Sequence, residues 1–131
     1  MITLYLIRGV PGSGKSTFAE SLLNSGMVDF VYEADDYFYE DGEYKFNASK
    51  LGEAHKQCQS NVRSALINGR SVAVSNTSTT EDEVRVYKRI AEEFAAHFVS
   101  VVVENRHEGV SVHNVPEDKI RQMKDRFSIK L

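Results

Sequence analysis

The sequence predicts an α/β domain in which a parallel β-sheet carries helices on both faces. Short apolar segments alternate with longer segments of helical periodicity along the whole chain, and this alternation is typical of parallel sheets. With 131 residues, 41% of them hydrophobic, residues 1–131 are long enough for one domain with its own core and too short for a second. A glycine-rich segment near the start of the chain is the third observation, and it indicates where the functional site lies.

That segment, residues 9–17, reads Gly-Val-Pro-Gly-Ser-Gly-Lys-Ser-Thr and matches the phosphate-binding pattern G-x-x-x-x-G-K-[ST]. The apolar residues Ile2–Ile7 before it predict a buried strand, and Phe18 and Leu22 after it have helical spacing. Strand, glycine-rich loop and helix together predict a P-loop NTPase fold that binds a nucleoside triphosphate. The expected nucleotide-binding residues are Gly9, Pro11, Gly12, Ser13, Gly14, Lys15, Ser16 and Thr17.

Each residue type in the loop has a physical reason to be there. The glycines let consecutive backbone N–H groups point inward around phosphate oxygens, at the positive end of the following helix. Lys15 is expected to reach the β- and γ-phosphates, and the Ser16 hydroxyl is expected to hold Mg²⁺. The alternative is an ordinary glycine-rich turn between a strand and a helix.

The next part of the chain is acidic. Residues 27–34 predict a second strand that ends at Asp35-Asp36, and the stretch from Asp29 to Glu43 contains seven carboxylates and no Lys or Arg. The aromatic-rich segment from Tyr37 to Phe46 is expected to be a loop that lines a cleft. A helix capped by Asn47 then extends to about Asn68.

The second half of the chain repeats the strand–helix pattern. Residues 71–75 predict a third strand, residues 76–79 a polar loop, and Thr80 with Glu83 a capping box for a helix ending near Ala96. Residues 98–103 predict a fourth strand buried on both faces, residues 104–115 a loop, and Pro116 the first position of a last helix. The residues expected to face inward on these two helices are Val84, Tyr87, Ile90, Ala91, Phe94, Ile120, Met123 and Phe127.

Four polar or loop residues directly follow predicted strands: Gly9, Asp35, Asn76 and Arg106. Because ligands of parallel sheets bind at the carboxyl ends of the strands, we expect these four to lie near one site. Asp35 is the expected general base for an acceptor hydroxyl, although a turn or cap role for Asp35-Asp36 is the alternative. Arg106 is either an arginine that reaches the γ-phosphate from a lid or a plain surface residue.

Composition and charge exclude several classes of function. The formal net charge is −3, and a negative net charge does not favour nonspecific binding to nucleic acid. No apolar run approaches transmembrane length, so no membrane association is expected. The single cysteine, Cys58, and the lack of a signal peptide before the first strand predict a cytoplasmic protein. His107 and His113 have no visible third ligand, so a zinc site is not expected.

The chain resembles the kinase domain of the polynucleotide 5′-hydroxyl kinases, including the short phage-type and NEDD4-binding-protein-2-like P-loop kinases. The resemblance is carried by residues 8–17, 34–38, 76–77, 115–116 and 123–124. It implies transfer of the ATP γ-phosphate, with Mg²⁺, to the 5′-hydroxyl of a nucleic acid. Asp35 would be the general base and Arg106 the lid arginine, and Asp35, Tyr37, Asn76 and Thr77 would face the acceptor.

Two departures from the family pattern keep other acceptors open. The chain has Asn76 where the family usually has Asp, and Phe38-Tyr39-Glu40 where polynucleotide kinases place an arginine for the acceptor phosphate. Tyr37, Phe38 and Tyr39 would instead stack a base, or simply pack the loop. The alternatives are therefore a kinase of a small molecule, such as a nucleoside, sugar or antibiotic, and an NTP-binding module without acceptor chemistry.

Overall fold

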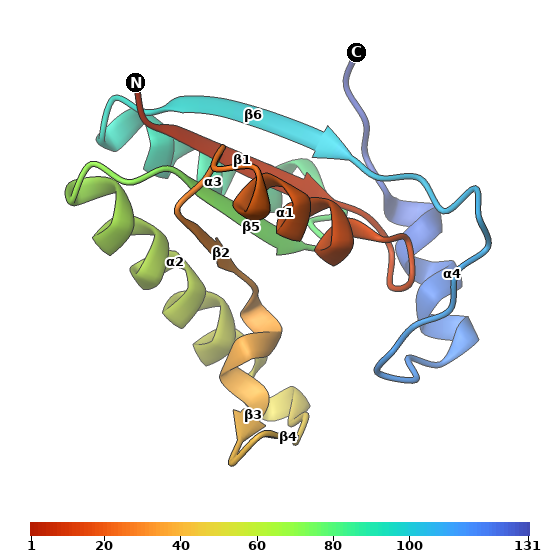
Figure 1. Cartoon of the computed structure of the whole chain (residues 1–131). Coiled ribbons are helices and arrows are strands. Elements are labelled where there is room, and N and C mark those ends of the chain that lie inside the picture. The colour runs from red at the N-terminus through yellow and green to blue at the C-terminus, as the bar shows by residue number, and fades with distance from the viewer.

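The computed structural model describes all of residues 1–131. Its main sheet contains β1 (Thr3–Arg8), β2 (Phe30–Tyr32), β5 (Val72–Asn76) and β6 (His97–Val102). These strands are all parallel and lie in the spatial order β2-β5-β1-β6 (Figure 1). Because they run in one direction, the segments that follow them meet at one edge of the sheet, as expected for Gly9, Asp35, Asn76 and Arg106.

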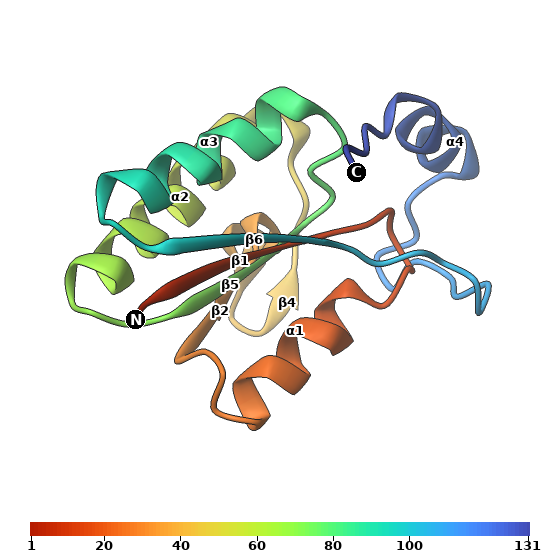
Figure 2. The same cartoon turned by 90° about the horizontal axis from the view of Figure 1, so that it is seen from above.

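Helices cover both faces of this sheet, which confirms the predicted fold class. Helix α1 (Lys15–Asn24) packs on one face, and α2 (Leu51–Ile67) and α3 (Glu81–Glu93) pack on the other (Figure 2). Helix α4 (Glu117–Arg126) lies beyond the carboxyl edge of the strands, beside the phosphate-binding end of the sheet.

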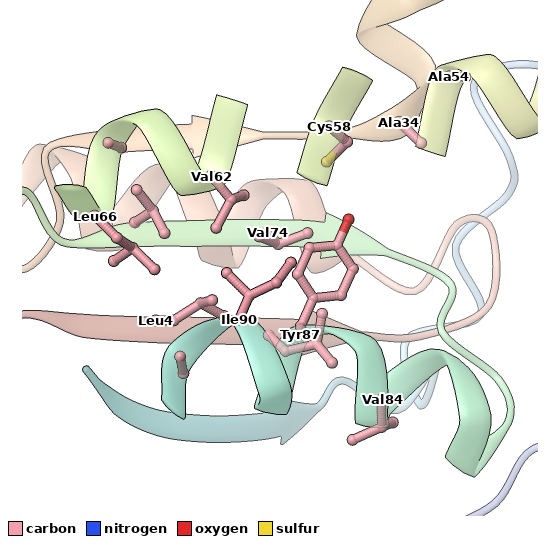
Figure 3. Close-up of a cluster of buried hydrophobic side chains, with 14 of the residues drawn as sticks. Leu4, Ala34, Ala54, Cys58, Val62, Leu66, Val74, Val84, Tyr87 and Ile90 are labelled. Atoms are coloured by element: carbon pink, nitrogen blue, oxygen red, sulfur yellow. The ribbon is translucent and has the colours of Figure 1, made fainter. Parts of the chain in front are cut away.

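The larger of two hydrophobic clusters fills the space between the sheet and helices α2 and α3. In Figure 3, Cys58 and Val62 of α2 face Val74 of β5, and Tyr87 and Ile90 of α3 complete the layer. The predicted inner face of α3 is confirmed, and its capping box of Thr80 and Glu83 is present. The smaller cluster, Ile7, Ala19, Val28 and Ala73, joins the sheet to α1. Burial of apolar surface at roughly 25 cal/mol per Å² is the main force that holds these layers together.

The second strand is shorter than predicted. It contains only Phe30–Tyr32, although residues 27–34 are all suited to a strand. It is an edge strand that pairs only with β5, and the N–H of Val28 before it donates to the Leu22 carbonyl at the end of α1. After it, Glu33 caps a 3₁₀ helix, η1 (Ala34–Phe38). Asp35 and Asp36 therefore lie in the first turn of a short helix and not in a loop.

The fourth strand is also less buried than predicted. Every residue of β6 is half-buried or exposed, because β6 is the other edge of the sheet and pairs only with β1. A continuous apolar sequence indicates a strand, but it does not distinguish a central strand from an edge strand that rests on one helix.

The aromatic segment after η1 is a hairpin where a loop was expected. Strands β3 (Tyr39–Glu40) and β4 (Glu43–Tyr44) pair antiparallel across Asp41 and Gly42. Both turn residues have positive φ, 52° and 79°, as a two-residue turn of this kind requires. A short 3₁₀ turn, η2 (Ala48–Lys50), capped by the Asn47 side chain, then leads into α2.

Candidate active site

The phosphate loop connects β1 to α1 and needs its glycines for steric reasons. Gly12 and Gly14 have φ values of 86° and 95°, a left-handed conformation that other residues rarely adopt. A Cβ at Gly12 would also lie 2.8 Å from the carbonyl oxygen of Gly109, in the loop between β6 and α4. The phosphate loop therefore packs directly against the β6–α4 loop.

Lys15 and Ser16 begin α1, at the positive end of that helix. Burial lowers the pKa of the Lys15 ammonium, while the negative charges of Glu33 and Asp35 partly oppose that shift. The Ser16 hydroxyl donates a hydrogen bond to Oε1 of Glu33 at 2.5 Å. The Ser16–Glu33 hydrogen bond thus joins the start of α1 to the residue after β2.

Asp35 is half-buried, and its carboxylate has two neighbours from distant parts of the chain. The Tyr44 hydroxyl donates to Oδ1 of Asp35 at 3.3 Å, and Nε2 of His113 lies 4.0 Å from Oδ2. Burial is the largest factor that raises the pKa of Tyr44 to about 12, followed by the charge of Asp35. The Tyr44 phenol therefore remains a hydrogen-bond donor throughout the neutral range.

The neighbouring Asp36 has a structural contact. Its Oδ2 accepts a hydrogen bond from the backbone N–H of Glu33 at 3.1 Å, which closes the first turn of η1. Burial raises the pKa of Asp36, and that hydrogen bond opposes the shift. Asp36 therefore has the cap role that the sequence left as the alternative for the Asp35-Asp36 pair.

Asn76 is buried at the carboxyl end of β5, and its side chain contacts the backbone of a neighbouring segment. Its Oδ1 accepts a hydrogen bond from the backbone N–H of Ala34 at 2.9 Å. The carbonyl of the next residue, Thr77, accepts a bond from the N–H of Gly9 at 3.4 Å. The Asn-Thr pair therefore connects β5 both to the residue before Asp35 and to the phosphate loop.

Two other expected site residues point to partners outside this group. The Tyr37 hydroxyl donates to the Glu53 carboxylate of α2 at 2.6 Å. Arg106 is exposed and pairs with Glu104, with 2.5 Å between Nε and Oε2. Of the expected aromatic wall, Phe38 belongs to the hydrophobic core and is only 4% exposed, so it cannot stack on a ligand.

A cavity of about 490 Å³ lies beside the phosphate loop, between Pro11, the β6–α4 loop and α4. It has a mixed lining of polar and apolar side chains, among them Asn105, Val115, Ile120, Arg121 and Lys124. A second hollow, of about 420 Å³, is lined by Ser16 and by Glu20, Asp29, Glu33 and Asp36. No group of three or more His, Cys, Asp or Glu side chains is placed to hold a metal ion. No helix is long and apolar enough to cross a membrane.

Three residues of this site were not predicted from the sequence to belong to it: Glu33, Tyr44 and His113. For Tyr44 a signal was present, since Asp41-Gly42 between aromatic residues is typical of a hairpin turn and would have paired Tyr44 with Tyr39. Glu33 and His113 acquire their positions only through the tertiary fold. Neither residue has a local pattern that predicts its contact.

A strand, a glycine-rich loop and a helix at the carboxyl edge of a parallel sheet, with a lysine and a serine at the start of the helix, define the P-loop NTPase fold. Residues 4–129 match the AAA domain family AAA_33, and the chain belongs to that family. The fold is that of the P-loop kinases.

Comparison with individual proteins agrees with this assignment. The human NEDD4-binding protein 2 is 35% identical over 92 residues, which are 70% of this chain and only 5% of that protein. A chain of the Pnkp1/Rnl/Hen1 RNA repair complex superposes with a TM-score of 0.65 at 20% identity, over 95% of this chain and 37% of the other. A mutant of the Mycobacterium tuberculosis APS kinase CysC gives a TM-score of 0.63 at 13% identity, over 95% and 96% of the two chains.

Proposed function

We propose that this protein transfers the γ-phosphate of ATP to a hydroxyl group, and that the acceptor is the 5′-hydroxyl of a nucleic acid. The observation that carries the proposal is the placement of Asp35 near Lys15. Lys15 follows the loop after β1 and Asp35 follows β2, so both residues lie at the carboxyl edge of the same parallel sheet. A base within reach of the phosphate-binding lysine is what phosphoryl transfer needs and what a pure nucleotide-binding module does not need.

In this proposal the chain's residues divide the work. Residues 9–17 and the Lys15 ammonium hold the phosphates, and Asp35 orients the acceptor hydroxyl and takes its proton. The cavity beside Pro11 has the size of a small-molecule site and would take the nucleoside part of ATP. Arg106 would act on the γ-phosphate after leaving its surface partner Glu104.

The oxygen atoms of Ser16 and Glu33 fit a Mg²⁺ ion, because the two groups already lie within hydrogen-bond distance and Mg²⁺ prefers hard oxygen ligands. When bound there with the nucleotide, the ion would neutralise developing charge on the phosphates. Tyr37, Asn76 and Thr77 would support the acceptor side: Asn76 by fixing the residue before Asp35, and Tyr37 by tying η1 to α2.

The proposed acceptor rests on the resemblance of residues 8–17, 34–38 and 76–77 to the polynucleotide 5′-hydroxyl kinases. The fold shared with a chain of an RNA repair complex is compatible with that acceptor. One structural observation favours a small-molecule acceptor as the second candidate. The hairpin next to Asp35 carries Glu40, Asp41 and Glu43, with Lys45 as its neighbouring cation, and such an acidic surface repels a polyanion.

The test is a transfer assay with γ-labelled ATP and Mg²⁺ against a panel of acceptors. The panel contains 5′-hydroxyl DNA and RNA oligonucleotides, 3′-phosphate mononucleotides, free nucleosides, simple sugars and water alone. Label on an oligonucleotide end supports the proposed function. Label on a nucleoside or sugar but on no oligonucleotide replaces it with the second candidate. Label found only as free phosphate, at equal rates in wild-type and Asp35→Asn protein, contradicts phosphotransfer and leaves an NTPase or binding module.

A further inference from the structure

The carboxylate of Asp35 lies between two aromatic side chains from segments far apart in the sequence. Tyr44 belongs to β4, and its hydroxyl donates to Oδ1 at 3.3 Å. His113 belongs to the β6–α4 loop, and its Nε2 lies 4.0 Å from Oδ2, a distance for an electrostatic contact and beyond that of a hydrogen bond. The two side chains thus approach different oxygen atoms of one carboxylate.

The two aromatic rings also contact each other. The ring centroids of Tyr44 and His113 are 3.8 Å apart, and the planes differ by 16°, so the rings are stacked face to face. This stack is the point where the β3–β4 hairpin meets the β6–α4 loop. It fixes the orientation of each side chain with respect to the other, and therefore with respect to Asp35.

Further contacts fix the segment that carries each of the two stacked residues. The ring of Tyr44 packs against the buried Phe38, with centroids 6.4 Å apart, which joins the hairpin to the core. On the other side, the Ser111 hydroxyl accepts bonds from the backbone N–H groups of His113 and Val115, at 3.3 and 3.4 Å. Because the same loop also packs on Gly12 through Gly109, it contacts both the phosphate loop and the candidate base.

We propose that Tyr44 and His113 are positioning residues that hold the Asp35 carboxylate in the orientation needed to accept a proton. The inference rests on the proposed function, in which Asp35 takes the proton of the acceptor hydroxyl. As the acceptor oxygen bonds to the γ-phosphorus, the bond from that phosphorus to the β–γ bridging oxygen breaks and ADP leaves. Tyr44 and His113 exchange no proton with the substrate and act only through Asp35.

Matched substitutions separate hydrogen bonding from stacking. Tyr44→Phe and His113→Phe keep a ring at each position and remove the polar atom that faces Asp35. His113→Gln keeps a donor and removes the ring. Tyr5→Phe, in the middle of β1, and His97→Gln, exposed at the start of β6, are control changes remote from the site. Each variant is assayed for transfer to a 5′-hydroxyl oligonucleotide, for ATP hydrolysis with water as acceptor, and for ATP affinity.

We expect the turnover number of Tyr44→Phe to fall roughly tenfold or more, the effect of losing one hydrogen bond to a charged group, while ATP affinity stays constant. His113→Phe is also expected to lower turnover without changing ATP affinity. His113→Gln is expected to retain more turnover than His113→Phe, because it keeps a donor. Because both residues act through one carboxylate, the double Phe variant should lose less than the product of the single losses. The Asp35→Asn variant should be insensitive to either change.

Three results would overturn the inference. One is a loss of ATP affinity in step with turnover, since that indicates a general structural defect. Another is a turnover number equal to that of the wild type in both Phe variants, while Asp35→Asn has lost turnover. That result leaves the proposed function intact and refutes only the positioning role of Tyr44 and His113. The third is a wild-type protein that labels none of the acceptors and releases label only as free phosphate, at the same rate as Asp35→Asn, which overturns the proposed function together with this inference.

Discussion

At the level of one residue, Lys15 lowers the stability of the folded protein because its charged ammonium is buried. Its ammonium is largely removed from water, which lowers its pKa even though Glu33 and Asp35 are near. A lowered pKa means that folding disfavours the charged form at neutral pH, and this penalty declines as the pH rises from the pKa of the folded state to that of the unfolded state. The phosphates of ATP would place further negative charge beside this ammonium.

We therefore predict that Lys15→Met removes ATP binding without lowering the thermal stability of the nucleotide-free protein. The methionine keeps the apolar stem and removes the desolvated charge. Calorimetric titration with ATP and thermal unfolding without nucleotide measure the two effects. Lys88→Met, an exposed lysine on α3, is the control, and it should bind ATP as the wild type does. ATP binding or turnover retained in Lys15→Met would refute the phosphate-loop assignment.

At the level of elements, the position of Asp35 depends on how β5 is joined to η1. The buried Asn76 amide accepts the hydrogen bond of the Ala34 N–H, one residue before Asp35. The family usually has Asp at this position, and this departure was one reason why the sequence left the acceptor open. In the structure, the atom that matters is an acceptor oxygen, which both residues possess.

This geometry predicts different results for two substitutions at Asn76. Asn76→Ala leaves a buried N–H unpaired, so the free energy of unfolding should fall by about 1–3 kcal/mol and phosphoryl transfer should fall with it. Asn76→Asp keeps the acceptor and should retain most of both. Chemical denaturation and the transfer assay provide the readouts. A large loss of transfer in Asn76→Asp with normal stability would indicate a direct role at the acceptor and contradict the positioning role.

The elements that could be predicted are those with a strong local pattern. The phosphate loop, the capping box of Thr80 and Glu83, and the inner face of α3 are confirmed because motif, cap and periodicity all lie within one stretch of chain. The extent of β2 and the exposure of β6 were predicted wrongly, since both depend on which strand is at an edge. Neighbouring strands decide that, and local sequence does not.

At the level of the whole molecule, Arg8 joins two distant segments to the end of β1. Its Nε donates to the Ser78 carbonyl at 2.8 Å, its Nη2 donates to the Ser128 carbonyl at 2.6 Å, and the guanidinium lies 4.9 Å from the centre of the Phe127 ring. The residue is 4% exposed. Burial lowers the pKa of Arg8, and the charges of Glu81 and Glu83 oppose the shift. These contacts attach the segment after α4 to the sheet.

Arg8→Lys is predicted to lower the free energy of unfolding by about 1–3 kcal/mol, because one ammonium cannot replace a planar group that donates in two directions. Hydrogen exchange should become faster at the C-terminal segment around Ser128 before it does in the core. The control is Arg85→Lys, an exposed pair with Asp82, where a change below about 0.5 kcal/mol is expected. Equal effects of the two substitutions would contradict the anchoring role.

The candidate site was only partly predictable from the sequence, because some of its contacts form only between segments that are distant in the chain. Lys15, Ser16 and Asp35 follow from a motif and from strand ends, so the topology alone brings them to one edge. The Arg106 role still rests on the family pattern, because its side chain pairs with Glu104 in the structure. His113 reaches Asp35 from a loop 78 positions further along the chain, by way of a stack with a hairpin residue. Only the packed molecule shows that contact.

The central claim is that Asp35 acts as a base for transfer from a nucleotide held by Lys15. It is tested most directly by measuring label transfer from γ-labelled ATP and ATP affinity on the same preparations of wild-type and Asp35→Asn protein. We predict that transfer falls by roughly 10²–10⁴-fold, the usual effect of losing an acid–base group, while ATP affinity is unchanged. Unchanged transfer, or an ATP affinity that falls as far as transfer does, would contradict the claim.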